Sequence, residues 1–161
     1  MSGLPQAMNT ADAQRAVLLE QYMHAHIPLV AQMQVKVTAL NDSGLLLTAP
    51  LAPNINHERT AFGGSLVSLM TLACWGYLWV LLDEGRGLHI VVRDAHVEYL
   101  KPVTGLLEAR CAPADAEPLD RFRDTLARRG KARIELKAEM LQDVAVAARY
   151  TGSFAVIREQ A

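Results

Sequence analysis

The sequence predicts a single α+β domain in which an antiparallel β-sheet wraps around one long apolar helix. The first observation is that the segment from Thr60 to Leu82 contains no charged residue, so a helix there needs cover on nearly all sides. The second is that the chain after this segment alternates apolar and polar residues with a period of two. Such strands have one face in a core and one face in water. Strands that curl around the helix satisfy both patterns.

Length and composition indicate one ordinary globular domain spanning residues 1–161. Hydrophobic residues make up 51% of the chain and charged residues 20%, and the net charge is -1 at pH 7, which disfavours a disordered or nucleic-acid-binding protein. Cys74 and Cys111 lack the spacing of a metal site and the density of a disulfide scaffold, so we expect them in the core. The N-terminal residues do not resemble a signal peptide. We therefore expect a cytoplasmic protein without a metal ion, a cofactor or a nucleic-acid partner.

Before the apolar segment, the sequence predicts a short helix and a β-hairpin. The helix covers about residues 10–26 and ends before Pro28. Its apolar face consists of Ala13, Ala16, Leu19 and Met23. Residues 34–40 and 45–49 alternate like strands on either side of a turn that contains Asn, Asp, Ser and Gly, and they therefore form the hairpin.

The apolar segment itself predicts a helix over about residues 62–83. Its length and lack of charge also fit a membrane-spanning helix, but glycine, serine and threonine residues dilute its apolar character. The amphipathic strands around it need a soluble core, so we expect no membrane. The remaining elements are strands at 88–100, 106–112, 131–141 and 144–157 and a short surface helix at 118–130.

The junction between the preceding loop and the long helix best fits a binding site. Glycines 63 and 64 begin the helix, and the first turn of a helix leaves backbone N–H groups without internal partners. The helix dipole favours negative charge there, so a developing oxyanion fits at Gly64 or Ser65. Glycine has no Cβ, which lets a substrate carbonyl approach closely. The same glycine pair also fits close packing of the helix against the sheet.

The stretch NINHERTAFGGSLVSLM, followed by VEYLKPVTG, resembles the hotdog-fold thioesterase superfamily over most of the chain. Within the superfamily, Asn-x-Asn before Thr-x-Phe-Gly-Gly-Ser is similar to the thioesterase domain that also occurs C-terminal to an N-acetyltransferase module. The resemblance implies a hotdog fold, with a long central helix wrapped by an antiparallel sheet. It also implies a homodimer that binds an acyl-CoA or acyl-carrier-protein thioester at its interface. Whether such dimers pair into tetramers stays open.

Two positions depart from the better-known members of the superfamily, in which a histidine precedes the glycine pair and an acidic residue lies further along the helix. Here these positions hold Phe62 and Thr71. The usual base that activates water is therefore missing. We expect Asp94 to act as the general base and Asn56 to orient water or the thioester carbonyl, with Gly64 as the oxyanion site.

Further residues are expected to contact the substrate, and some of them also fit structural roles. The expected substrate-binding residues are Asn54, His57, Phe62, Gly63, Ser65, Ser68 and Thr71. Asn54 and Asn56 also fit a role in capping the loop through Asx turns. Asp94 alternates with His96 and Glu98 on one strand face, which is typical of a solvated or interface surface.

Two other functions remain open at this point. A hotdog dehydratase or hydratase needs a histidine paired with a carboxylate, and His57 with Glu58 or Asp94 are the candidates. A non-catalytic acyl-binding or dimerisation module fits the threonine at position 71, where family enzymes have an acid. A basic run is typical of a solvated helix face but also fits phosphate groups of a substrate or an acidic partner; it comprises Arg121, Arg123, Arg128, Arg129, Lys131 and Arg133.

Overall fold

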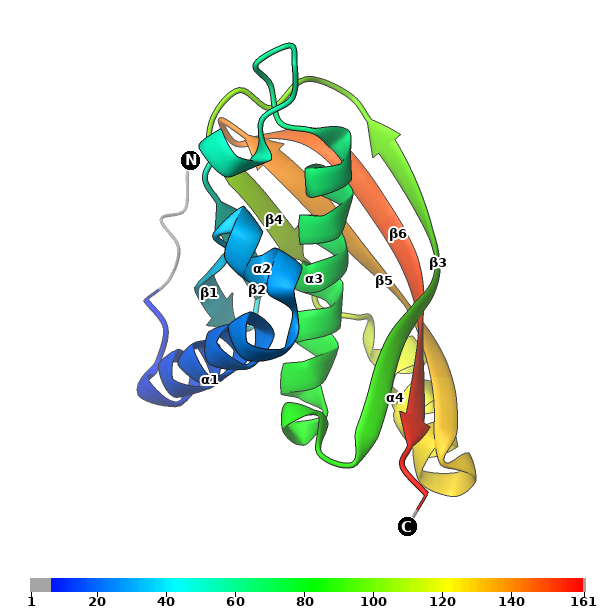
Figure 1. Ribbon diagram of the computed structural model, residues 1–161. Coiled ribbons are helices and arrows are strands. Elements are labelled where there is room, and N and C mark those ends of the chain that lie inside the picture. The colour runs from blue at the N-terminus through cyan, green and yellow to red at the C-terminus, as the bar shows by residue number, and fades with distance from the viewer. Residues whose placement is uncertain (1–6, 161) are drawn as a thin grey trace.

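The computed structural model describes residues 7–160, in which one six-stranded antiparallel sheet curves around a central helix (Figure 1). The helices are α1 (Thr10–His26), α2 (Pro28–Met33), α3 (Gly63–Leu81) and α4 (Ala116–Arg129), and 3-10 turns cover Ala52–Asn54 and Asp83–Gly85. The strands are β1 (Lys36–Asn41), β2 (Gly44–Ala49), β3 (Leu88–Tyr99), β4 (Leu107–Cys111), β5 (Lys131–Gln142) and β6 (Ala145–Arg158). The predicted fold class is confirmed. Residues 1–6 lie outside the described residues. They are part of the N-terminal segment that was predicted not to be a signal peptide.

The central helix α3 is covered by protein on its apolar sides. The sheet curves around one side and α1 packs against another (Figure 1). Among the helices of residues 7–160, α3 is the one long and apolar enough to span a bilayer. Its buried residues are Leu66, Leu69, Met70, Leu72, Ala73, Cys74, Gly76, Leu78, Trp79 and Val80, and each fully buried leucine contributes roughly 2 kcal/mol to folding. The prediction that its own strands cover this helix is confirmed.

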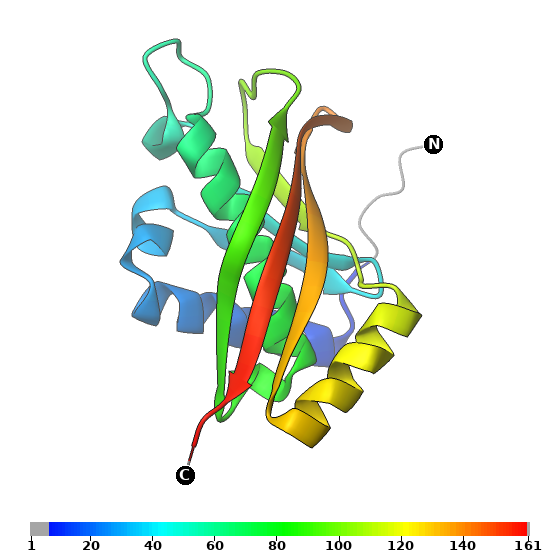
Figure 2. The ribbon, with the colours of Figure 1, turned by 90° about the vertical axis from the view of Figure 1, so that its right-hand side faces the viewer.

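The strand order places β3 at an open edge of the sheet. Neighbouring strands follow the order β1-β2-β4-β5-β6-β3, so β3 pairs with β6 on one side and has no partner strand within residues 7–160 on the other. Nine of the twelve β3 residues are exposed and none is buried. Figure 2 shows β3, β6 and β5 side by side, with α4 next to β5. An edge strand of this length presents a row of free N–H and C=O groups.

The helix boundaries agree with the prediction except around Pro28. Helix α1 ends at His26 as expected, but Pro28 begins the short helix α2. Proline suits the first turn of a helix because its φ is already helical and its missing N–H would have no partner there. Helix α4 begins slightly earlier than predicted, at Ala116, and ends as predicted at Gly130, which has φ 67°.

The two cysteines lie in the core, as predicted. Cys74 on α3 and Cys111 on β4 are both buried. A hydrogen bond with Cys111, together with burial, raises the pKa of the Cys74 thiol well above its ordinary value. A thiol with a raised pKa is a poor nucleophile at neutral pH, so Cys74 has the properties of a packing residue.

The turn between β5 and β6 leads to a prediction about stability. Asp143 and Val144 have φ of 48° and 63°, and Gln142 pairs with Ala145, so two left-handed residues form the hairpin loop. Valine is strained in this conformation, which glycine adopts freely. We expect Val144→Gly to stabilise the protein by about 1 kcal/mol, measured by urea unfolding. Val144→Ala is the control, and equal stability of the two variants would contradict this explanation.

Candidate functional site

The loop before α3 is held in shape by the side chain of Asn56. Its Oδ1 accepts hydrogen bonds from the backbone N–H groups of Glu58 (2.9 Å) and Thr60 (3.1 Å). Its Nδ2 donates to Thr60 Oγ1 (3.0 Å) and to the Ala61 carbonyl (3.4 Å). Both ends of the amide are thus engaged within the loop. This is the capping role that an Asx turn predicts, and it leaves Asn56 little capacity to orient a water molecule.

Asn54 joins the loop to the N-terminal part of the protein. The side chain is buried, with 2% of its surface exposed, and its Nδ2 donates to the carbonyls of Pro50 (2.8 Å) and Met33 (3.0 Å). Its backbone carbonyl accepts from the N–H of Phe62 (2.8 Å). Asn54 therefore fixes the residue that precedes α3 and does not face an open substrate site.

The first turn of α3 presents free backbone donors. Phe62 occupies the N-cap position and no side chain caps the helix. The N–H of Ser65 donates to the Phe62 carbonyl (2.9 Å), so Ser65 is not the oxyanion donor that the sequence allowed. Within residues 7–160, no backbone acceptor outside the helix bonds the N–H of Gly63 or Gly64. These two amides, at the positive end of the helix dipole, can therefore donate hydrogen bonds to a negatively charged oxygen.

Two aromatic side chains flank the glycines. A Cβ at Gly64 would overlap the ring of Phe62, which is 57% exposed. On the other side, the Tyr99 hydroxyl donates to the carbonyl of Gly63 (3.1 Å), and a Cβ at Gly63 would lie 3.5 Å from the Tyr99 ring. Sequence analysis did not single out Tyr99. The contact fixes the end of β3 against the start of α3.

Further along α3, one polar side chain bonds to the helix backbone and another bonds to the sheet. Ser68 Oγ donates to the Gly64 carbonyl (2.8 Å), and Thr71 Oγ1 donates to the Tyr150 hydroxyl (3.2 Å). Tyr150 is fully buried on β6 and was also missed by the sequence analysis. Burial raises its pKa, the hydrogen bond from Thr71 lowers it, and nearby charges, including Asp94, raise it further. The Tyr150 hydroxyl therefore stays protonated at neutral pH.

Asp94 lies on the exposed edge strand. It pairs with Ser153 of β6 after a bulge that follows Val92. Ser153 lies between the buried residues Phe154 and Gly152, so its side chain faces away from α3. The side chain of Asp94, its cross-strand partner, faces the same way. No ion pair within residues 7–160 involves Asp94. The carboxylate is thus free of cations, and its charge reaches Tyr150 through the sheet.

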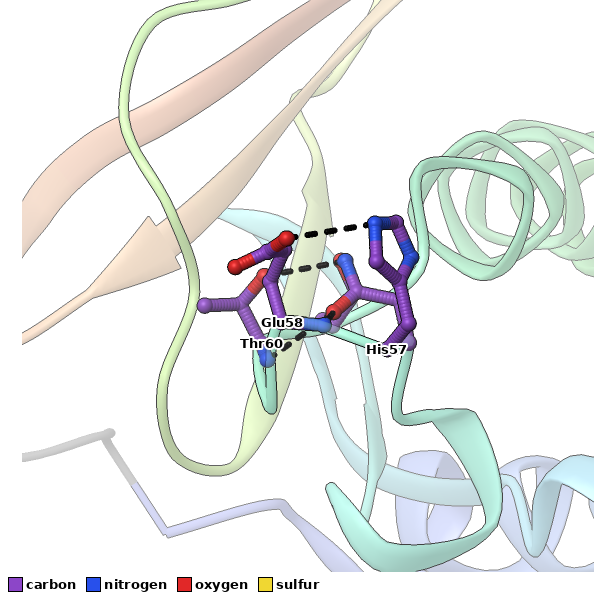
Figure 3. Close-up of polar contacts among 5 residues, drawn as sticks. His57, Glu58 and Thr60 are labelled. Atoms are coloured by element: carbon purple, nitrogen blue, oxygen red, sulfur yellow. Dashed lines mark hydrogen bonds and ion pairs between the residues drawn. The ribbon is translucent and has the colours of Figure 1, made fainter.

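His57 and Glu58 form a pair at the tip of the loop. The distance between His57 Nε2 and Glu58 Oε1 is 3.3 Å, and the side chains are 85% and 74% exposed. Figure 3 shows the two side chains directed toward each other, with Thr60 beside them. Water surrounds both groups, so within one subunit this pair lacks the enclosed surroundings that a dehydratase site needs.

A long helix inside a curved antiparallel sheet, with glycines at its free N-terminus, defines a hotdog domain of the thioesterase class. Residues 16–158 match the family described as "Putative thioesterase (yiiD_Cterm)", and the chain belongs to this family.

Solved structures of similar proteins agree with this family assignment. A protein of unknown function from Chlorobaculum tepidum is 33% identical, with a TM-score of 0.87 over 92% of this chain and 97% of that one. A protein described as a "putative thioesterase" from Shewanella oneidensis is also 33% identical, with a TM-score of 0.78 over 90% and 99%. A thioesterase from Haemophilus influenzae, 16% identical, shares the fold with a TM-score of 0.71 over 97% and 96% of the two chains.

Proposed function

We propose that this protein hydrolyses an acyl thioester whose carbonyl oxygen binds at the start of α3. The observation that supports this most directly is the pair of free amides at Gly63 and Gly64, next to a helix start without a side-chain cap. Two N–H donors at the positive end of a helix stabilise the oxyanion that forms when water attacks the carbonyl carbon. Membership of a thioesterase family supports the same reaction.

The chemical step needs a base, because water is a weak nucleophile at neutral pH. In our proposal the carboxylate of Asp94 takes a proton from water as its oxygen bonds to the carbonyl carbon. The intermediate then collapses, the carbon–sulfur bond breaks, and the proton passes to the leaving thiolate. The products are a carboxylic acid and a thiol. Asn56 contributes by holding the loop, and Phe62, Ser68 and Thr71 line the path of the acyl group.

We propose that two copies of the chain pair through β3, so that each site receives residues from both subunits. The open edge of β3 supports this, as do its exposed apolar side chains Val91, Val92 and Tyr99 and the exposed Leu100 that follows the strand. Pairing would satisfy the free backbone groups of the edge and bury these side chains. It would also bring β3 of one subunit, the strand that carries Asp94, close to the α3 start of the other, where Tyr99 contacts Gly63. We propose a cytoplasmic location and acyl-CoA or acyl-carrier-protein substrates.

The dimer can be tested by placing a charge at its centre. We expect Val92→Arg to weaken dimerisation by roughly a hundredfold, because two like charges would lose water in the paired edge. The mass measured by light scattering should fall from that of two chains to that of one at micromolar concentration. Val144→Arg is the control, since this residue is 87% exposed in the β5–β6 turn. A wild-type mass for Val92→Arg would contradict pairing through β3.

Release of free thiol from a panel of acyl-CoA thioesters tests the reaction itself. Turnover of at least one member supports hydrolysis. Stoichiometric binding without turnover would favour the binding module, for which Thr71 in place of an acid is the specific observation. Reversible loss of water from a 3-hydroxyacyl thioester without thiol release would favour the dehydratase, with His57 and Glu58 as the pair.

A further inference from the structure

Helix α1 has an uncharged outer face. Its inward residues are buried in the core, yet Val17, Leu18 and Tyr22 are 55%, 44% and 38% exposed, so the helix is apolar on both sides. The side opposite the core carries a stripe of exposed residues, which we call the outer stripe and which consists of Ala11, Gln14, Leu18, Gln21 and Ala25. Figure 1 shows α1 at the margin of the fold. A helix whose outer side faces only water usually has charged residues there, so the outer stripe has the composition of a contact surface.

The charged residues of α1 make their contacts within the subunit. The Arg15 guanidinium lies 3.7 Å from the Asp12 carboxylate and donates to the carbonyl of Val80 near the end of α3. Glu20 Oε2 accepts a hydrogen bond from the N–H of Val37 (2.8 Å). No other aspartate, glutamate, lysine or arginine occurs in α1. Covering the outer stripe therefore removes no charge from water, and two such stripes do not repel each other.

The outer stripe is palindromic, which indicates what covers it. Its spacing of three, four, three and four residues is that of the seam of a two-stranded coiled coil. Read from either end, the residue types are alanine, glutamine, leucine, glutamine and alanine, with Leu18 in the centre. An interface with a two-fold axis places residue i against j and j against i. A second copy that runs antiparallel therefore places Ala11 opposite Ala25 and Gln14 opposite Gln21, and two glutamine amides can each donate and accept.

A shallow hollow lies over the N-terminal half of the same face. Its volume is about 540 Å³, and its described lining residues are Thr10, Ala13, Gln14, Val17 and Leu18. In the antiparallel arrangement, the C-terminal half of the second α1 lies opposite this hollow and brings Tyr22 of that copy to it. The Tyr22 ring already stacks on His26, with 4.1 Å between the ring centroids, so it loses little freedom when it packs there. A side chain of one helix that fills a hollow of the next is the packing that coiled coils use.

We propose that the outer stripe of α1 binds the outer stripe of a second copy of this chain, antiparallel and around a two-fold axis at Leu18. A lipid surface fits this face less well, because helices that lie on membranes carry lysine or arginine beside their apolar face. Helix α1 has no lysine, and its single arginine bonds Val80. The contact is short, since 17 residues span about 25 Å, so it forms at high protein concentration. It joins two β3-paired dimers, but requires neither that pairing nor the thioesterase reaction.

Cross-linking of introduced cysteines tests the arrangement. Around a two-fold axis only the central residue faces its own copy, so Leu18→Cys should be cross-linked to itself by a short bis-maleimide. In Ala11→Cys or Ala25→Cys, seven residues from the axis, the two thiols would be roughly 21 Å apart and should not react with the same reagent. The double variant Ala11→Cys/Ala25→Cys should react. The wild-type protein is the control, since its own cysteines are buried. No product with Leu18→Cys, or equal product with all three single variants, would overturn the proposal.

Sedimentation separates this contact from pairing through β3. The average mass of the wild-type protein should double over a concentration range around roughly 100 µM, as expected for a small interface. Leu18→Arg should abolish this doubling, because two like charges would meet at the axis, while Val144→Arg should not. The doubling, and the product of Leu18→Cys, should persist when Val92→Arg is added, whether the starting mass is that of two chains or of one.

Other occupants of the outer stripe give different results. A wild-type mass that does not change with concentration would overturn the proposal. Cross-linking of Leu18→Cys only after removal of residues 1–6 would identify that segment as the occupant and would overturn it as well. So would binding to phosphatidylcholine vesicles that Leu18→Arg abolishes, without any association between copies, because the occupant would then be lipid.

Discussion

Gly64→Val is expected to lower kcat/KM for thioester hydrolysis by roughly 10²- to 10³-fold, the loss typical of an impaired oxyanion hole. The branched side chain would stand over the first turn of α3, where in our proposal the amides of Gly63 and Gly64 bind the oxyanion. The Cβ would overlap the ring of Phe62, but this ring is half exposed and can turn away, so the fold should persist. The measurement is steady-state thiol release, together with circular dichroism.

Two further variants separate the possible causes of this loss. Gly105→Val places the same side chain in the β3–β4 loop, where a Cβ would lie 3.6 Å from the Gln142 side chain, and it should remain folded and active. The double variant Phe62→Ala/Gly64→Val removes the overlap with the ring. If activity returns in the double variant, the displaced ring causes the loss and the amides do not bind the oxyanion.

The fold was predictable because its strongest signals are local in sequence. The uncharged stretch from Thr60 to Leu82 predicted α3 to within two residues at each end. The alternation in residues 131–141 predicted β5, in which the odd-numbered residues are exposed and the even-numbered residues buried over 131–140. A periodic pattern requires an apolar or a polar residue at many positions, so one exception does not change the predicted element. The wrapping of the sheet around the helix then followed from the need to cover one apolar helix.

The candidate site was less predictable because its contacts join residues that are distant in sequence. Thr71 and Tyr150 are separated by 79 positions, and Gly63 and Tyr99 by 36. Neither tyrosine differs in sequence pattern from an ordinary core or edge residue. Local signals alone also left two roles open for Asn56, and the hydrogen bonds of the loop favour the capping role.

The bulge in β3 illustrates the same limit. Strict alternation from Val91, which faces outward, would turn Asp94 toward α3. The extra residue between Val92 and Asp94 shifts the alternation, so that Asp94 lies in the outward row of Ser153. No glycine or proline marks this position in the sequence. The side on which Asp94 lies was therefore not predictable from the pattern.

Asp94→Asn is the second large effect that we expect, with a loss of roughly 10²- to 10⁴-fold in kcat, as for removal of a general base. The carboxylate is exposed, has no ion-pair partner within residues 7–160, and is close enough to Tyr150 for its charge to raise the pKa of that residue. Tyr150 in turn bonds Thr71, at the position of the missing acid. Within one subunit the side chain of Asp94 faces away from α3, so a loss of this size requires that the carboxylate acts at the β3 edge of the proposed dimer.

Glu98→Gln is the matched control for this variant, because it removes one carboxylate from the same outward row of β3. In Asp94→Asn, asparagine has the shape of aspartate and the position is exposed. The free energy of unfolding should therefore change by less than about 0.5 kcal/mol. A base that acts only in the chemical step should lower kcat and leave KM nearly unchanged. If Asp94→Asn and Glu98→Gln have the same small effect, Asp94 belongs to a solvated surface and the base lies elsewhere, with the His57–Glu58 pair as the next candidate.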